Sequence, residues 1–245
     1  MLTPLMGLAL LIAVMVVALT ERAGGKIGFV DIHAMIVVFG GVLGSLLLAI
    51  DRKSLGQMLI TLRELAPSKT FFTHQMRKTQ QGIDVMSNAW RESRRSEILK
   101  IADHGATEEL RVAADALLRQ LSGPNLNEKF TALRTKYMNQ MLPVIDGWEI
   151  VSKLAPSFGM VGTVTGMVQL FKNMGENSGN LGGAMAMALL ATLYGIAMGA
   201  AVGGPMAARV NSQLNERLAF IDLLEKTVAS LIDEQTRLGN LNTAE

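Results

Sequence analysis

The sequence predicts an all-α, polytopic membrane protein with four transmembrane helices and a helical cytoplasmic domain. This prediction depends on apolar spans free of charge, on charge gathered between them, and on the absence of sustained strand-like alternation. The spans without Asp, Glu, Lys or Arg are residues 2–20, 32–50, 154–171 and 181–208. Each is long enough, or nearly so, to cross a hydrocarbon layer about 30 Å thick as a helix with its backbone bonded internally.

Composition excludes several classes of function. All 23 Lys and Arg and all 21 Asp and Glu residues lie outside the spans, and a net charge of +2 does not support a nucleic-acid partner. The chain has no Cys, which excludes a disulfide framework, a thiolate metal site and cysteine catalysis. His33, His74 and His104 lack the spacing of metal ligands. The sequence therefore predicts neither an enzyme nor a bound metal or other cofactor.

The spans divide the chain into four segments. Residues 1–50 form a first membrane hairpin, 51–153 a cytoplasmic helical domain, 154–208 a second hairpin, and 209–245 a cytoplasmic amphipathic tail. The first apolar run lacks the basic start of a secretory signal, so we interpret it as a retained helix. Lys and Arg near the span ends are more numerous beside the second and fourth segments. This bias places both segments in the cytoplasm. An even number of spans puts the two termini on the same side of the membrane, so both are predicted to be cytoplasmic.

The cytoplasmic segment is expected to be helical with three breaks. They fall at Pro67, near Gly105, and more firmly at Ser122-Gly123-Pro124. Between the first two breaks, apolar spacing predicts a helix across residues 75–102.

Two further helices flank the second hairpin. One runs from Asn125 into the third span, and Pro143 is expected to kink or interrupt it. The other is the tail, where apolar residues recur at steps near three and four: Leu214, Leu218, Ile221, Leu224, Val228, Leu231 and Ile232. Such a face needs either a partner surface or a membrane surface to lie on.

Small residues recur at intervals of four in the third and fourth spans. Gly162 and Gly166 form one such pair, and Gly195, Gly199 and Gly203 form a row. Small residues at this spacing let neighbouring helices approach closely. The neighbour is either a partner subunit or another helix of the same chain.

Hydroxyl groups and prolines interrupt the same two spans. Thr163, Thr165 and Thr192 can ligate a partly dehydrated cation or bond a partner's carboxyl group; alternatively, each bonds back to a carbonyl of the preceding turn. Pro156 and Pro205 lie near the cytoplasmic ends of these spans. They indicate either hinge points or static kinks, because proline frees a helix carbonyl.

The densest basic cluster lies in the cytoplasmic segment. It contains Arg91, Arg94 and Arg95, with Glu97 beside them. A cluster of this kind is either a solvated helix face or an interaction surface for an acidic cytoplasmic protein.

The layout and three motifs resemble the MotA/PomA family of flagellar stator A subunits, and more distantly the TolQ/ExbB proton channels. The motifs are LAPSFGMVGTVTGM in the third span, and AMAMALLATLYG and GGPMAARV in the fourth. The resemblance implies a homo-pentamer around the membrane helices of two MotB/PomB-like B subunits, a 5:2 complex in the bacterial inner membrane. It also implies that a B-subunit Asp carries the coupling ion, and that a rotor switch protein is the cytoplasmic partner.

The resemblance also implies roles for particular residues. Pro156 and Pro205 are similar to the paired prolines of the family, and Thr163 and Thr192 to hydroxyls that line the ion path of sodium-type members. Ala191 departs from the sodium-type pattern, so sodium is favoured only slightly over protons.

Arg91 resembles the rotor-facing arginine of the family, but the expected acidic residue about two turns later is not matched, with Glu97 only nearby. Lys153 also departs from the family pattern.

Two other functions stay open on sequence grounds. A TolQ/ExbB-like energiser would pass ion-driven motion to a periplasmic partner, but four predicted spans favour the stator, because that group has three. A secondary transporter is disfavoured, because the spans contain no charged residue and the chain has no evident inverted repeat.

Overall fold

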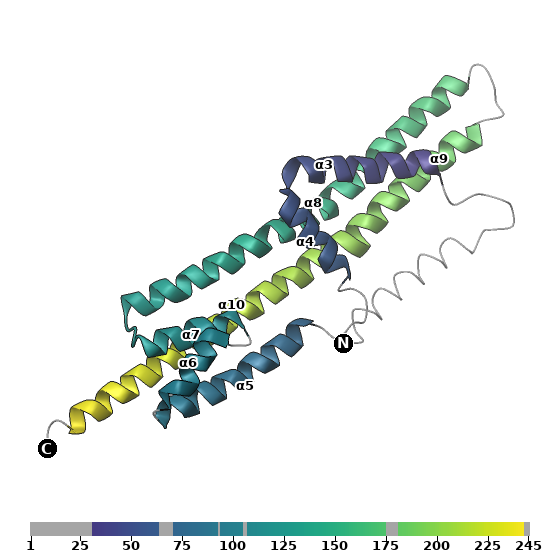
Figure 1. Cartoon of the computed structure of the whole chain (residues 1–245). Helices are drawn as coiled ribbons and strands as arrows, with labels where there is room; N and C mark the ends of the chain where they lie inside the picture. Colours follow the sequence, from purple (N-terminus) through teal and green to yellow (C-terminus); the bar gives the residue numbers. More distant parts are fainter. Residues whose placement is uncertain (1–30, 64–70, 93, 105–106, 175–180, 243–245) are drawn as a thin grey trace. The chain divides into compact units, whose positions relative to one another are not determined.

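The computed structural model describes residues 31–63, 71–92, 94–104, 107–174 and 181–242 (Figure 1). Within these ranges all regular structure is helical, as predicted. The predicted first span, residues 2–20, lies outside them. The chain divides into two compact units, Met1–Pro67 with Leu142–Asn211, and Ser68–Met141 with Ser212–Glu245. In the described residues, three helices are long and apolar enough to cross a membrane.

The second predicted span belongs to the first unit. It consists of α2 (Ile32–Met35), a π-helical turn η1 (Ile36–Gly40) and α3 (Gly41–Ala49). Asp31 caps its start, because its carboxylate accepts from the backbone N–H groups of His33 at 2.8 Å and Ala34 at 3.1 Å. The span ends where Ile50 adopts an extended backbone.

A short helix, α4 (Arg52–Arg63), follows the second span and also belongs to the first unit. The sequence-based division had placed these residues with the aqueous segment. Thr61 accepts a hydrogen bond from the indole Nε1 of Trp148 at 3.1 Å, and Met58 is buried. These contacts join α4 to the part of α8 in the same unit.

The third predicted span lies in α8 (Pro124–Asn173). The helix begins at Pro124, one residue before the predicted start at Asn125, and follows Gly123, whose φ of +56° favours glycine. Of the two effects expected at Pro143, a kink or an interruption, the interruption was wrong, because α8 continues through this residue. A proline inside a helix costs about 3 kcal/mol. Buried Val144, Ile145 and Trp148 directly after Pro143 offset that cost by packing.

The fourth predicted span comprises α9 (Leu181–Ile196), a π-helical segment η3 (Ala197–Gly203) and the start of α10 (Gly204–Asn242). In the first unit, α2 and η1 pack on α9. The buried residues of this contact are Ala34, Val38, Met187 and Ala191.

The second unit contains α5 (Phe71–Arg91), α6 (Arg95–His104) and α7 (Glu108–Leu118), with the adjoining parts of α8 and α10. The single helix predicted across residues 75–102 was wrong, because the chain turns between α5 and α6. Arg94 donates its N–H to the carbonyl of Ala89 at 2.8 Å in this turn. The turn lets α6 pack against both α5 and α7, and Trp90 before the turn and Ile98 after it are both buried.

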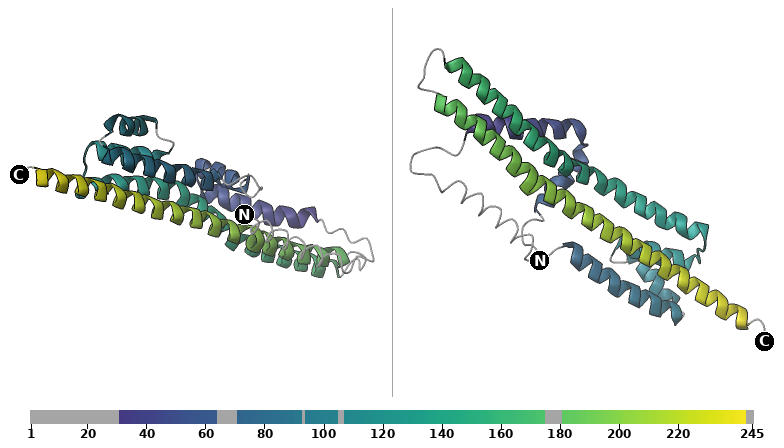
Figure 2. Two further views of the ribbon diagram at one scale, coloured as in Figure 1. Left: turned by 90° about the horizontal axis from the view of Figure 1, so that it is seen from below. Right: turned by 180° about the vertical axis from the view of Figure 1, so that it is seen from behind.

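The tail half of α10 runs beside α8 within the second unit (Figures 1 and 2). Its apolar face is buried there: Leu214, Ile221, Leu224, Val228, Leu231 and Ile232 are all below 9% exposed. The predicted amphipathic helix is confirmed. The tail packs on its own chain, so the alternative of a helix lying on the membrane surface is wrong.

Candidate functional site

The glycines of the third span pack against α9 of the same chain. A Cβ added at Gly162 would collide with the Cβ of Ala191. At Gly166 it would lie 2.7 Å from the Cβ of Ala188 and 2.9 Å from the carbonyl oxygen of Ala184. Of the two interpretations of these glycines, the structure therefore supports close packing inside one chain.

The glycine row of the fourth span faces the proline turn of the third. A Cβ at Gly195 would lie 2.5 Å from the carbonyl oxygen of Ala155, and one at Gly199 would lie 2.8 Å from both the carbonyl oxygen of Ser152 and Cδ of Pro156. Pro156 has no N–H for the carbonyl of Ser152, which lies four residues earlier. The freed carbonyl thus sits against the π-helical segment η3, whose last residue lies two before Pro205.

Two of the three predicted threonines meet between α8 and α9. The hydroxyl groups of Thr163 and Thr192 form a short hydrogen bond, and each also lies 3.3 Å from the carbonyl oxygen of Ala188. Thr163 donates in addition to the carbonyl of Gly159 at 3.0 Å. Thr165 stands apart and bonds back to the carbonyl of Val161 at 2.9 Å.

The Thr163–Thr192 cluster places two hydroxyl and two carbonyl oxygens together within the uncharged third and fourth spans. Hard cations prefer oxygen ligands of this type. Around it, α8 exposes large apolar side chains: Met160, Val161, Val164, Met167, Val168 and Phe171. A surface of this kind needs lipid or another apolar helix against it.

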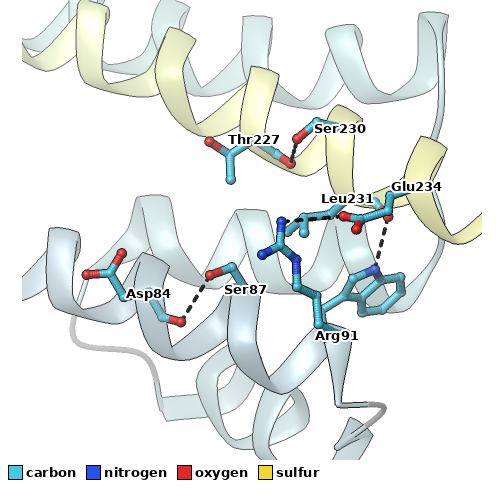
Figure 3. A network of polar contacts seen from close by, with 8 residues as sticks. Asp84, Ser87, Arg91, Thr227, Ser230, Leu231 and Glu234 are labelled. Carbon is cyan, nitrogen blue, oxygen red and sulfur yellow. Dashed lines mark hydrogen bonds and ion pairs between the residues drawn. The ribbon is translucent and has the colours of Figure 1, made fainter.

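The predicted rotor-facing arginine belongs to a different cluster from its neighbours. Arg91 lies at the end of α5, and its Nη2 is 3.5 Å from Oε2 of Glu234 on α10 (Figure 3). The indole Nε1 of Trp90 donates to the carbonyl of Leu231 at 3.2 Å and holds the two helices together. Arg91 is 62% and Glu234 49% exposed, so this pair lies on the surface.

Arg94 and Glu97 form the second cluster. Arg94 pairs with Glu92 and, at 2.8 Å, with Glu97 across the turn between α5 and α6. Arg95 is exposed and makes no ion pair with another described residue. The acidic partner of Arg91 is Glu234, which sequence reasoning missed because it lies 143 residues further along the chain.

A buried ion pair, also missed from the sequence, joins α7 to α10. The guanidinium of Arg217 binds Oε1 of Glu109 at 2.8 Å and lies 3.8 Å over the ring of Tyr137. Glu109 is only 4% exposed, and its Oε2 has no hydrogen-bond partner among the described residues. Burial by itself would raise the pKa of Glu109, but a backbone hydrogen bond and the charge of Arg217 outweigh it and lower the pKa.

Together the fold and the site define a class: a helical membrane protein in which uncharged spans meet at a pair of hydroxyl groups. Residues 106–222, which include the third and fourth spans, match the model of the MotA/TolQ/ExbB proton channel family. The resemblance indicated by the motifs is confirmed over this region. No curated protein sequence matches the chain.

Two solved structures have a similar fold. The first is C. jejuni MotAB, with a TM-score of 0.78 and 14% identity over 95% of this chain and 89% of that one. The second is the flagellar MotAB stator complex from Bacillus subtilis, with a TM-score of 0.72 and 18% identity over 98% of both chains. At these identities the likeness establishes the fold.

Proposed function

We propose that this chain is the A subunit of an ion-driven flagellar stator, which couples cation flow along a B-subunit membrane Asp to torque on the rotor. The observation that carries the proposal is the Thr163–Thr192 cluster. It gathers oxygen ligands in two spans that contain no carboxylate, inside the region matched by the family model. A coupled cation therefore needs a carboxylate from another subunit, because a bare charge in hydrocarbon is costly.

We propose an assembly that meets this requirement and agrees with the family resemblance. A MotB-like partner supplies the Asp, and five copies of this chain surround two copies of the partner in the bacterial inner membrane. The chain crosses the membrane four times with both termini in the cytoplasm. The similarity to two MotAB structures supports a partner of this kind.

The proposal is tested first by deletion of the gene in its host. Deletion is expected to give cells that build flagella but do not rotate them, and expression of the intact chain is expected to restore rotation. Undiminished rotation after deletion would contradict the proposal. If a defect of a periplasmic process appeared instead, the TolQ/ExbB-like energiser would replace the stator.

The hydroxyl pair predicts a graded effect of threonine substitution. Thr192→Val keeps the shape and removes the hydroxyl, and it is expected to slow rotation about tenfold or more, since a hydrogen bond to a charged group contributes about 1.5–3 kcal/mol. Thr165→Val is the matched control, because Thr165 only bonds its own helix. Rotation speed at fixed membrane potential is the measurement. Equal speeds in the two variants would contradict a role of the pair.

The coupling ion is tested by measuring rotation speed in the same cells. Sodium must shed water and needs replacement oxygens, whereas a proton can ride on the partner's carboxylate. We propose sodium, slightly favoured over protons. Speed is then expected to rise with external sodium, and full speed in sodium-free medium would establish protons instead.

The cytoplasmic charges are proposed to contact the rotor switch protein. Reversal of Arg91, Arg94 and Arg95 together to Glu is expected to abolish torque and leave membrane assembly intact, because exposed charges steer association more than they stabilise a fold. Reversal of Arg119, an exposed arginine of the same unit, serves as the control. Unchanged motility of the triple variant at low and high ionic strength would identify the cluster as a solvated face.

A further inference from the structure

Helix α4 lies directly after a membrane span. The span ends at Ala49, the extended backbone of Ile50 interrupts the helix axis, and α4 begins at Arg52. Figure 1 shows α4 leaving α3 at an angle. A helix of its length extends about 18 Å, at about 1.5 Å per residue. All of α4 therefore lies within a short distance of the membrane end of α3.

One face of α4 is fixed by its contacts in the first unit. Met58 is buried, and Thr61 accepts from Trp148. The absence of a side chain at Gly147 admits the side chains of Ile50 and Met58, because an added Cβ there would lie 2.6 Å from Cδ1 of Ile50. These contacts determine which residues of α4 point outward.

The outward face carries apolar and basic residues. Leu59 is 68% and Ile60 61% exposed. Arg52 and Lys53 lie seven residues before them, two turns away and on the same face. Both are exposed, and neither makes an ion pair with another described residue. The helix sequence contains no Asp or Glu that would offset their charge.

We propose that α4 is an interfacial helix that binds anionic phospholipid. Leu59 and Ile60 insert between lipids, and the cations of Arg52 and Lys53 bind the negatively charged headgroups. The apolar surface is continuous along the chain with that of α3, where Leu48 is 92% exposed. Exposed apolar residues combined with unpaired cations beside a span fit an anionic membrane surface.

The binding has a consequence for the second span. Because α4 is also tied to α8 through Trp148, its attachment to lipid fixes the depth at which the cytoplasmic end of α3 sits. The inference is independent of the proposed stator function, since it needs only a bilayer.

Fluorescence tests the proposal directly, because the natural chain has no Cys. Leu59→Cys provides the one site for an environment-sensitive dye, and the full chain is placed in lipid nanodiscs that contain spin-labelled lipid. Ser54→Cys is the matched control, a half-buried position of the same helix about 140° away around the axis. The dye at position 59 is expected to be strongly quenched by lipid, and the dye at position 54 weakly.

The headgroup preference is tested with spin-labelled lipids of either charge. Quenching at position 59 is expected to be stronger with phosphatidylglycerol than with phosphatidylcholine. Arg52→Gln and Lys53→Gln are each expected to reduce the preference about fivefold, the effect of one cation near an anionic surface.

Three results would overturn the inference. Aqueous emission without quenching at position 59 would mean that the face is in solvent. Blue-shifted emission without lipid quenching would mean that a protein, such as a second copy of this chain, covers it. Equal quenching by the two lipids would exclude a role of the headgroup charge.

Discussion

Proteoliposomes that contain this chain alone are expected to hold an ion gradient, whereas those that contain the chain with the proposed B subunit are expected to leak. The four apolar spans carry no Asp, Glu, Lys or Arg. The only oxygen cluster described in them, around Thr163 and Thr192, already satisfies its own hydroxyl groups. A cation would exchange its water for a few neutral oxygens in hydrocarbon, at a cost of several kcal/mol or more.

Ion flux across the vesicle membrane is the measurement, with a fluorescent dye for sodium or for pH inside. A B subunit whose membrane Asp is replaced by Asn is the control, and its vesicles are expected to be as tight as those with this chain alone. Fast, saturable leakage through this chain by itself would contradict the prediction and would support a transporter.

Arg217→Ala is expected to destabilise the second unit by about 3–5 kcal/mol, because it leaves a buried carboxylate without its counter-charge. Glu109 is only 4% exposed, and one of its oxygens has no hydrogen-bond partner among the described residues even with the arginine present. The substitution also removes the guanidinium from the ring of Tyr137. Loss of helical signal on heating the purified chain in detergent is the measurement.

Two controls separate this ion pair from ordinary surface pairs. Arg119→Ala removes an arginine that is 65% exposed and pairs with Asp115, and it is expected to cost less than about 1 kcal/mol. The double change of Glu109 and Arg217 to Met is expected to recover most of the lost stability, since no charge is then buried. An Arg217→Ala protein as stable as the Arg119→Ala protein would contradict the prediction.

The pair also predicts how stability depends on pH. The pKa of Glu109 is lower in the folded chain than its ordinary value of about 4.3. A lowered carboxyl pKa contributes stability that is present above the ordinary pKa and is lost as pH falls through the folded value. In the Arg217→Ala variant the charge of the arginine no longer lowers the pKa of Glu109, so this variant is expected to lose less stability on acidification than the natural chain.

Much of the architecture follows from the chain itself. The uncharged spans are long enough to specify membrane helices without reference to any neighbour, because hydrocarbon admits only internally bonded backbone. The tail is specified by its period, since Ile221, Leu224 and Val228 recur at helical spacing. The break before α8 is specified by Gly123 and Pro124, whose backbone preferences are local. Such features depend on residues close together in sequence.

Tertiary structure decided the remaining features, because the contacts that fix them join residues far apart in the sequence. The apolar spacing across α5 and α6 is compatible with one helix, and the turn between them is required only by the packing of α6 against both α5 and α7. Glu234 completes the charge pair of Arg91, and Arg217 meets Glu109 108 residues away. Thr163 and Thr192 are joined by the packing of α8 on α9. No local propensity encodes such pairings, since they exist only once helices have packed.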